Sequence, residues 1–218
     1  MHTDSRWERE RLVFLKDSLS VSGASIIDIG GNTGYFSIEL LESGADNVLY
    51  YEGNRDHSRF LSLAAAMLGV GERLLIKNEY YGFCGDPHGP VDIGLLLNVL
   101  HHVGDDYGGS RTSAAEALGA MAGNLNYMAD KVDHLVLQIG YCWKGDTSQL
   151  LFPKGTKNEQ IEFFTSTTEQ HWDIARIGIA EKHGDSIRYA EPSIENLRRD
   201  DSMGEFLNRP IFILRSRK

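Results

Sequence analysis

The feature that most constrains the fold is a regular alternation between short apolar runs and longer segments of helical periodicity. Apolar, β-branched runs predict strands at 25–29, 47–52, 73–77, 91–97 and 134–139. Segments with apolar residues at helical spacing lie before or between them, at 7–19, 34–43, 55–67, 113–128 and 158–172. This alternation predicts an α/β protein with a parallel sheet and helices on both faces.

Two further strands are predicted near the C-terminus, at 175–180 and 210–214. A loop-rich stretch separates them, so we expect an antiparallel pair with an edge strand. The prediction is therefore a seven-stranded, mostly parallel, doubly wound sheet. In open sheets of this kind the ligand site lies outside the carboxyl ends of the strands, so the residues after the first four strands are the candidates.

Composition narrows the range of partners and compartments. The chain has 218 residues, 41% of them hydrophobic, which suits a single domain over 1–218 with a full core. The net charge of −9 argues against general attraction to nucleic acid phosphates. Cys84 and Cys142 are far apart and form no CxxC motif, so we expect free thiols in a reducing compartment.

The first residues, MHTDSRWERERLVFL, are charged and lack the apolar core of a secretory signal. No apolar run approaches the ~18 residues that a membrane span requires. A soluble cytoplasmic protein is therefore expected.

A glycine-rich turn, DIGGNTG, follows the first predicted strand. Gly30 and Gly31 let the backbone turn sharply next to a ligand, and Gly34 allows close packing of the next helix. A dinucleotide fingerprint, GxGxxG, requires glycine where Asn32 stands, and the phosphate-binding pattern GxxxxGK[ST] is missing here. The charge of Asp28 would repel phosphate and favours a cationic group such as an amine.

Polar residues also follow the next three strands. Glu52, 24 residues after Asp28, suits a bidentate contact to two ribose hydroxyls, because an ionised carboxylate only accepts hydrogen bonds. Asn78 and Glu79 are suited to accept from an exocyclic amine, and Tyr80 to cover a ring. The predicted ligand is a nucleoside with an amino-bearing tail and no pyrophosphate.

DIGGNTG, the acid Glu52 and DIGLLLNVLHHV together resemble class I S-adenosylmethionine-dependent methyltransferases. The first motif resembles the family pattern D/E-x-G-x-G-x-G, with Asn32 in place of the middle glycine. The resemblance implies a Rossmann-like sheet, the cofactor S-adenosyl-L-methionine, and methyltransferase activity.

The resemblance also implies a role for each cofactor contact. Asp28 and the 30–34 loop would hold the methionine moiety, Glu52 the ribose, Asn78 or Glu79 the adenine, and Asn98 with Val99 the floor below the sulfonium. The predicted cofactor residues are Asp28, Gly30, Gly31, Asn32, Gly34, Tyr35, Phe36, Glu52, Gly53, Asn78, Glu79, Asn98 and Val99.

His101 and His102 are the candidate catalytic residues. One of them would serve as general base toward the acceptor, since imidazole titrates near neutral pH. The alternative is that the pair packs at a strand-to-helix corner and shapes the pocket. A metal site using this pair with Asp105 and Asp106 is disfavoured, because adjacent residues on an extended chain point in opposite directions. No metal is therefore predicted.

The leading functional prediction is O-methylation of a small molecule or carbohydrate, such as a surface-polysaccharide sugar. The first alternative is an RNA methyltransferase, for which the only local basic excess is Arg209, Arg215, Arg217 and Lys218. The second is a regulatory subunit that binds the cofactor without catalysis. A dehydrogenase is a weaker rival, because GxGxxG is broken.

The acceptor pocket is expected from the least recognisable segments. These are an N-terminal helical segment at 1–22, which is either a lid or a cover for a sheet face, the loops at 80–90 and 104–112, and insertions at 141–173 and 184–209. The acceptor and the oligomeric state do not follow from these patterns.

Overall fold

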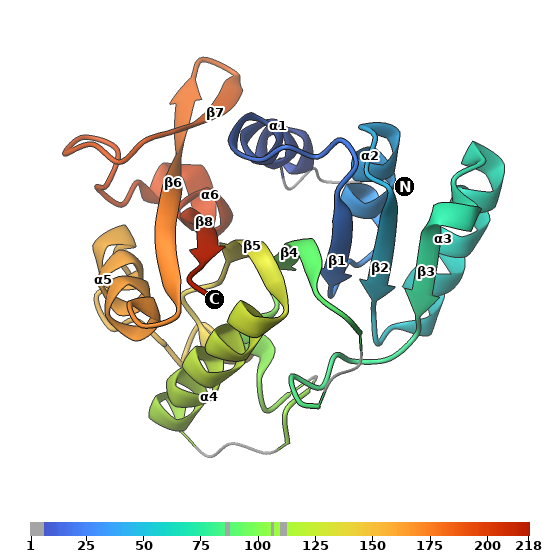
Figure 1. The fold of residues 1–218 in the computed structure, drawn as a ribbon. Coiled ribbons are helices and arrows are strands. Elements are labelled where there is room, and N and C mark those ends of the chain that lie inside the picture. Colours follow the sequence, from blue (N-terminus) through green and yellow to red (C-terminus); the bar gives the residue numbers. More distant parts are fainter. Residues whose placement is uncertain (1–6, 86–87, 106, 110–112) are drawn as a thin grey trace.

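The computed structural model describes residues 7–85, 88–105, 107–109 and 113–218, and its centre is an eight-stranded sheet (Figure 1). The strand order is β3-β2-β1-β4-β5-β8-β6-β7, and all neighbours from β3 to β5 are parallel. The remaining neighbours are antiparallel. The strands are β1 (Ser25–Ile29), β2 (Asn47–Tyr51), β3 (Leu74–Lys77), β4 (Val91–Leu97), β5 (Val132–Gln138), β6 (Trp172–His183), β7 (Ser186–Ala190) and β8 (Ile211–Ser216).

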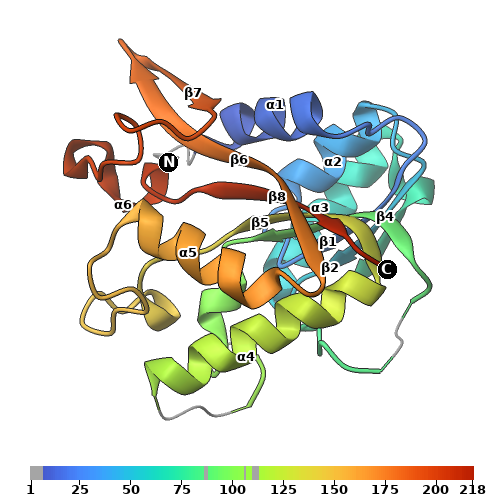
Figure 2. The same ribbon diagram turned by 60° about the vertical axis from the view of Figure 1, so that its left-hand side comes forward.

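Helices cover both faces of the sheet, as Figure 2 shows: α1, α2 and α3 lie on one face, and α4 and α5 on the other. Their bounds are α1 (Glu8–Ser18), α2 (Tyr35–Glu42), α3 (Arg55–Leu68), α4 (Ala114–Tyr127), α5 (Lys157–Thr168) and the short α6 (Gly204–Leu207). None of the helices in the described part of the chain is long and apolar enough to cross a bilayer.

Three helices begin at side-chain caps that the sequence encodes locally. The Asn54 side chain accepts a hydrogen bond from the Asp56 amide at the start of α3. Ser113 with Glu116, and Thr156 with Glu159, form capping boxes at the starts of α4 and α5. These caps satisfy amides that would otherwise lack partners, and so define where the chain leaves each loop.

The central strands are apolar on both sides, because each face of the sheet is covered. Neighbouring residues Ile26 and Ile27 of β1 are both fully buried, Ile26 in the core beneath α1–α3 and Ile27 in the core beneath α4 and α5. The continuous apolar runs in the sequence therefore reflect burial on both faces of a parallel sheet.

The predicted mostly parallel, doubly wound sheet is confirmed, and three details differ. The described residues form eight strands, because β6 turns back through Gly184, whose φ is +62°, into the unpredicted β7. The antiparallel β8 lies between β5 and β6, so the edge strand is β7. β6 also begins at Trp172 instead of 175, because a register shift between Ile174 and Arg176 breaks the alternation that marks a strand.

The N-terminal helix packs on a sheet face. Leu12, Phe14 and Leu15 of α1 are buried in the same core as Ile187 and Tyr189 of β7. The Phe14 and Tyr189 rings, 5.7 Å apart between centres, bring together positions 14 and 189 of the chain.

The Phe14 ring fits against β6 where Gly178 has no side chain. A Cβ atom at this position would lie 2.6 Å from the Phe14 ring. We expect Gly178→Ala to destabilise the protein by about 1–3 kcal/mol, because the ring has to move. Gly119→Ala, on the exposed side of α4 with nothing within 4 Å, is expected to stabilise it by up to about 1 kcal/mol. Urea unfolding of both variants checks this, and equal effects would contradict the packing argument.

Candidate functional site

The turn after β1 has the tight backbone that the glycines predict. Gly30, Asn32 and Gly34 all have positive φ, at +69°, +51° and +80°. A Cβ at Gly30 would lie 2.6 Å from the Val99 side chain, and one at Gly34 would lie 2.3 Å from Leu61. The glycines are therefore required both for conformation and for the close approach of the turn to β4 and α3.

Asn32 replaces a glycine of the family pattern and adopts the left-handed conformation that asparagine tolerates. Its amide donates to Glu52 Oε2 at 2.9 Å, and its carbonyl accepts a hydrogen bond from the Tyr50 hydroxyl. Its side-chain oxygen accepts from the Thr33 amide at 2.7 Å. Asn32 thus holds the turn through its own polar groups.

The Glu52 carboxylate joins the ends of β1 and β2. One oxygen accepts from the Asn32 amide, and the other accepts from the Asn54 amide at 2.8 Å. The side chain is 12% exposed. Because each carboxylate oxygen has two lone pairs, each retains the capacity to accept a further hydrogen bond. This arrangement can bind two adjacent hydroxyls.

Asp28 lies beneath the turn. Its side chain is buried and accepts a hydrogen bond from the Ser37 hydroxyl at 2.7 Å. Burial raises the pKa of Asp28 to about 6, the Ser37 hydrogen bond lowers this pKa, and the nearby Glu52 charge raises it. At neutral pH the carboxylate is therefore still mostly ionised and adds negative potential below the turn.

The residues after β3 lie beside the end of β2. The side-chain Nδ2 of Asn78 donates to the Glu52 backbone carbonyl at 3.0 Å and to the Ser58 hydroxyl at 3.2 Å. The Tyr80 ring covers Gly53, where a Cβ would lie 2.3 Å from the ring. The structure therefore brings these residues together with Glu52, while Glu79 is exposed next to them.

The two histidines have different surroundings although their ring centres are 4.4 Å apart. His101 is buried, and its Nδ1 accepts a hydrogen bond from the Gly140 amide at 3.3 Å. Burial, and secondarily the His102 and Arg209 charges, hold the pKa of His101 well below its usual range. His101 is therefore neutral at pH 7, with its proton on Nε2.

His102 is more open, with a side chain that is 31% exposed and an Nδ1 that lies 3.9 Å from Asp105 Oδ2. Asp106, the other acid of the disfavoured metal site, lies outside the described residues. Across the residues that the structure covers, no group of three or more His, Cys, Asp and Glu side chains is arranged to hold a metal ion.

A polar group lies at the ends of β4 and β5; the sequence predicted Asn98 but missed its partners Gln138 and Arg209. Asn98, with φ of +66°, donates through Nδ2 to Gln138 Oε1 at 3.1 Å. Arg209 Nη1 donates to Asn98 Oδ1 at 2.8 Å, and Gln138 Nε2 donates to the Arg209 carbonyl at 3.0 Å. We call these three residues the Asn98 triad. Gln138 had a detectable signal, because it is a polar residue at the carboxyl end of an apolar strand; Arg209 had none.

Arg11 was also missed. It is buried, although it lies on α1, and its guanidinium stacks on Phe36 and Phe206 at 5.0 and 4.8 Å from the ring centres. Its Nη1 lies 3.4 Å from Gln138 Oε1. The N-terminal helix therefore supplies a cation at the edge of the sheet where the predicted site residues gather.

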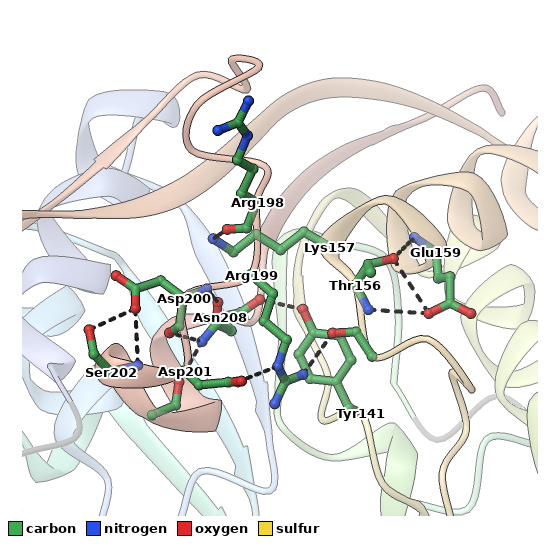
Figure 3. A network of polar contacts seen from close by, with 12 residues as sticks. Tyr141, Thr156, Lys157, Glu159, Arg198, Arg199, Asp200, Asp201, Ser202 and Asn208 are labelled. Atoms are coloured by element: carbon green, nitrogen blue, oxygen red, sulfur yellow. Dashed lines mark hydrogen bonds and ion pairs between the residues drawn. The ribbon is translucent and has the colours of Figure 1, made fainter.

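The segment at 191–209 contacts Tyr141, which follows β5, and Lys157 of α5 (Figure 3). Lys157, at the start of α5, is 2% exposed and donates to the carbonyls of Asn196 and Arg198 at 2.7 and 3.0 Å. Arg199 lies over the Tyr141 ring, 5.1 Å from its centre. The Tyr141 hydroxyl in turn donates to the carbonyl of Asn208. The segment is therefore held by Lys157 of α5 and by Tyr141, which follows β5.

Solved structures resemble the whole chain. Magnesium protoporphyrin IX methyltransferase (ChlM) from Synechocystis PCC 6803, solved with bound S-adenosylmethionine, is 16% identical, and the alignment covers 96% of this chain and 77% of ChlM, with a TM-score of 0.57. The bifunctional kinase-methyltransferase WbdD is 14% identical, with 97% and 40% of the chains covered and a TM-score of 0.58. A candidate RNA methyltransferase from Pyrococcus horikoshii is 14% identical, with 95% and 83% covered and a TM-score of 0.54.

The fold is that of class I methyltransferases. At 14–16% identity these similarities establish the fold alone, and the chain spans less than half of WbdD. No protein-family model matches the chain, and no curated protein matches it. The methyltransferase fold agrees with the glycine turn and the strand-end acid that suggested it.

The raised pKa of Asp28 predicts a pH-dependent stability. Between about pH 4 and pH 6 the folded protein keeps the Asp28 proton while the unfolded chain releases it. The free energy of unfolding of the wild type should therefore fall relative to that of Asp28→Asn as the pH rises through this window. Between pH 4 and pH 7.5 this relative loss of the wild type should amount to about 3 kcal/mol. Urea unfolding at pH 4 and pH 7.5 measures it, and the same difference at both pH values would contradict the raised pKa.

Proposed function

We propose that the protein is an S-adenosylmethionine-dependent methyltransferase that O-methylates a small molecule or carbohydrate. One observation supports this most strongly: the Glu52 carboxylate lies next to a turn that has no room for side chains at Gly30 and Gly34, and it retains lone pairs for two ribose hydroxyls. A nucleoside that ends in an amine fits this combination of an acidic turn and a free acceptor pair.

In this proposal each predicted cofactor residue has a defined place. Asp28 and the turn at 30–34 hold the methionine end, where the negative potential of Asp28 favours the ammonium group. Asn78 and Glu79 lie on the adenine side, next to Glu52, whereas Asn98 and Val99 lie below the sulfonium. Tyr35 and Phe36 begin the helix that follows the turn, and the Arg11 guanidinium lies over the Phe36 ring.

When bound, the cofactor supplies an activated methyl group. The protein has to align an acceptor oxygen with that methyl group, exclude water and accept the proton of the hydroxyl. Of the two candidate bases, His102 is better suited to accept the proton, because it is accessible and has Asp105 beside its Nδ1. His101 is buried, and its Nδ1 already accepts a hydrogen bond from the Gly140 amide. In this proposal His101 is therefore a fixed part of the pocket floor.

The charges near the C-terminus favour a small acceptor over RNA. Arg215 and Arg217 form ion pairs with Asp173, and Lys218 forms one with Asp133. Because β8 runs antiparallel to β5, these residues lie at the opposite end of the sheet from the glycine turn. These three residues therefore add no basic surface beside the proposed site. Arg209, which does lie beside it, is 14% exposed and forms an ion pair with Glu205. Two unpaired thiols, Cys84 and Cys142, agree with a location in the cytoplasm.

The cofactor proposal predicts tight binding of S-adenosylhomocysteine. We expect this ligand, but not NAD, to raise the melting temperature. Glu52→Gln should weaken binding at least about tenfold by calorimetry, because a neutral amide accepts less strongly from two hydroxyls. Glu72→Gln, on an exposed turn before β3, is the matched control and should bind as the wild type does. Equal affinity of Glu52→Gln and the wild type would contradict the ribose role.

The acceptor proposal is tested by transfer of a labelled methyl group into a cell extract that is fractionated by size. Label in the small-molecule fraction supports the proposal, label in RNA supports the RNA alternative, and cofactor binding without any transfer supports a regulatory subunit.

The His102 assignment predicts that the two histidine variants behave differently. With the labelled fraction as acceptor, His102→Ala should lower turnover on the order of 10²–10⁴-fold and leave S-adenosylhomocysteine affinity within about twofold of the wild type. His101→Ala should mainly lower the melting temperature, because it leaves a cavity and removes the acceptor of the Gly140 amide. Full turnover of His102→Ala would exclude His102 as the base.

A further inference from the structure

The Asn98 triad is a closed set of hydrogen bonds between three distant parts of the chain. Asn98 follows β4, Gln138 ends β5, and Arg209 precedes β8. Besides the three side-chain bonds, the Asn98 amide donates to the Gln138 carbonyl at 2.6 Å. Both ends of the Asn98 side-chain amide are therefore occupied, so its orientation is determined by Gln138 on one side and by Arg209 on the other.

The triad is largely shielded from water. Gln138 is fully buried, and the Arg209 side chain is 14% exposed. Arg209 Nη2 forms an ion pair with Glu205 at 2.9 Å, and the guanidinium lies 5.3 Å from the centre of the Phe206 ring. Hydrogen bonds to a charged donor are strong in such surroundings, and the loss of one partner leaves a buried oxygen unsatisfied.

The bond from Arg209 reaches the residue with the least favourable backbone at the end of β4. Asn98 has φ of +66°, a left-handed conformation that asparagine tolerates better than most residues but that still costs free energy relative to glycine. The next residue, Val99, packs directly on Gly30 of the turn. Any change in the Asn98 backbone therefore moves the surface between the glycine turn and the histidines.

Resting on the proposed function, we propose that Arg209 is a positioning residue of the cofactor site. By holding Asn98 Oδ1, it fixes the left-handed turn that forms the floor beneath the methionine end. Arg209 lies at the end of the segment at 191–209, part of which is drawn in Figure 3, and its bond to Asn98 connects this segment to the cofactor floor.

The test compares two ligands that differ in the methionine end. Calorimetry with S-adenosylhomocysteine and with adenosine is carried out on the wild type, Arg209→Ala, Arg209→Lys and Asn98→Ala. We expect Arg209→Ala to weaken S-adenosylhomocysteine binding about 10- to 100-fold, the effect of losing a hydrogen bond to a charged group. Adenosine binding should change less than twofold, because the ribose and adenine contacts come from β2 and β3.

Arg199→Ala is the matched control. Arg199 is an arginine of the same segment that also stacks on an aromatic ring and pairs with an acid, Asp201, but it has no contact with Asn98. It should bind both ligands as the wild type does. Arg209→Lys keeps the charge and most of the packing, and it is expected to bind S-adenosylhomocysteine with intermediate affinity; it also serves if Arg209→Ala does not fold.

The double variant Arg209→Ala/Asn98→Ala separates positioning from general destabilisation. If Arg209 acts through Asn98, the two losses of affinity are not additive. The double variant then binds S-adenosylhomocysteine about as tightly as the single variant with the lower affinity. Additive losses, equal losses for both ligands, or a loss in Arg199→Ala as large as in Arg209→Ala would overturn the inference. A wild type that binds neither ligand would overturn the proposed function, and this inference with it.

Discussion

The geometry of the site depends on one carboxylate that joins two strand ends. Backbone hydrogen bonds hold the parallel strands β1 and β2 together along their length. Beyond Ile29 and Tyr51, where these strands end, further contacts have to fix the position of the two loops. Glu52 provides them by accepting one backbone amide from each side. Because its two oxygens are bound in different directions, the carboxylate cannot rotate, and its remaining lone pairs have a fixed direction. Rigid acceptors of this kind bind a diol without an ordering cost at the moment of binding.

The Asp28 carboxylate lies close to that of Glu52, and it differs from Glu52 in being buried. Burial raises the pKa of Asp28, and the nearby Glu52 charge raises it further. Two anions at one turn are unfavourable in the free protein. In the proposed function, a ligand that carries a positive charge near Asp28 relieves this repulsion, whereas a phosphate group would add to it.

Much of the fold and half of the site follow from local sequence rules. Short β-branched runs, caps such as Asn54 and glycines at positive φ act over a few residues, and they predict the sheet and the turn. β7 and the start of β6 were missed because a hairpin edge and a bulge carry no long periodic signal. Arg11 and Arg209 could not be predicted, since neither an arginine in a charged helix nor one in a loop indicates burial until the distant partners Phe206 and Asn98 are known.

The contrast between local signals and contacts of distant residues explains why the cofactor is easier to infer than the acceptor. The two hydrogen bonds of the Glu52 carboxylate join residues 20 and 2 positions apart, within one β-α-β unit. The proposed acceptor side is held by contacts such as Arg209 to Asn98 and Lys157 to Arg198, which span 111 and 41 positions. In the proposed function, side chains of the segment at 191–209 can change the acceptor without altering any motif, provided that Arg209 keeps its bond to Asn98. A selectivity change that leaves cofactor binding intact should accordingly map to this segment and spare the Asn98 triad.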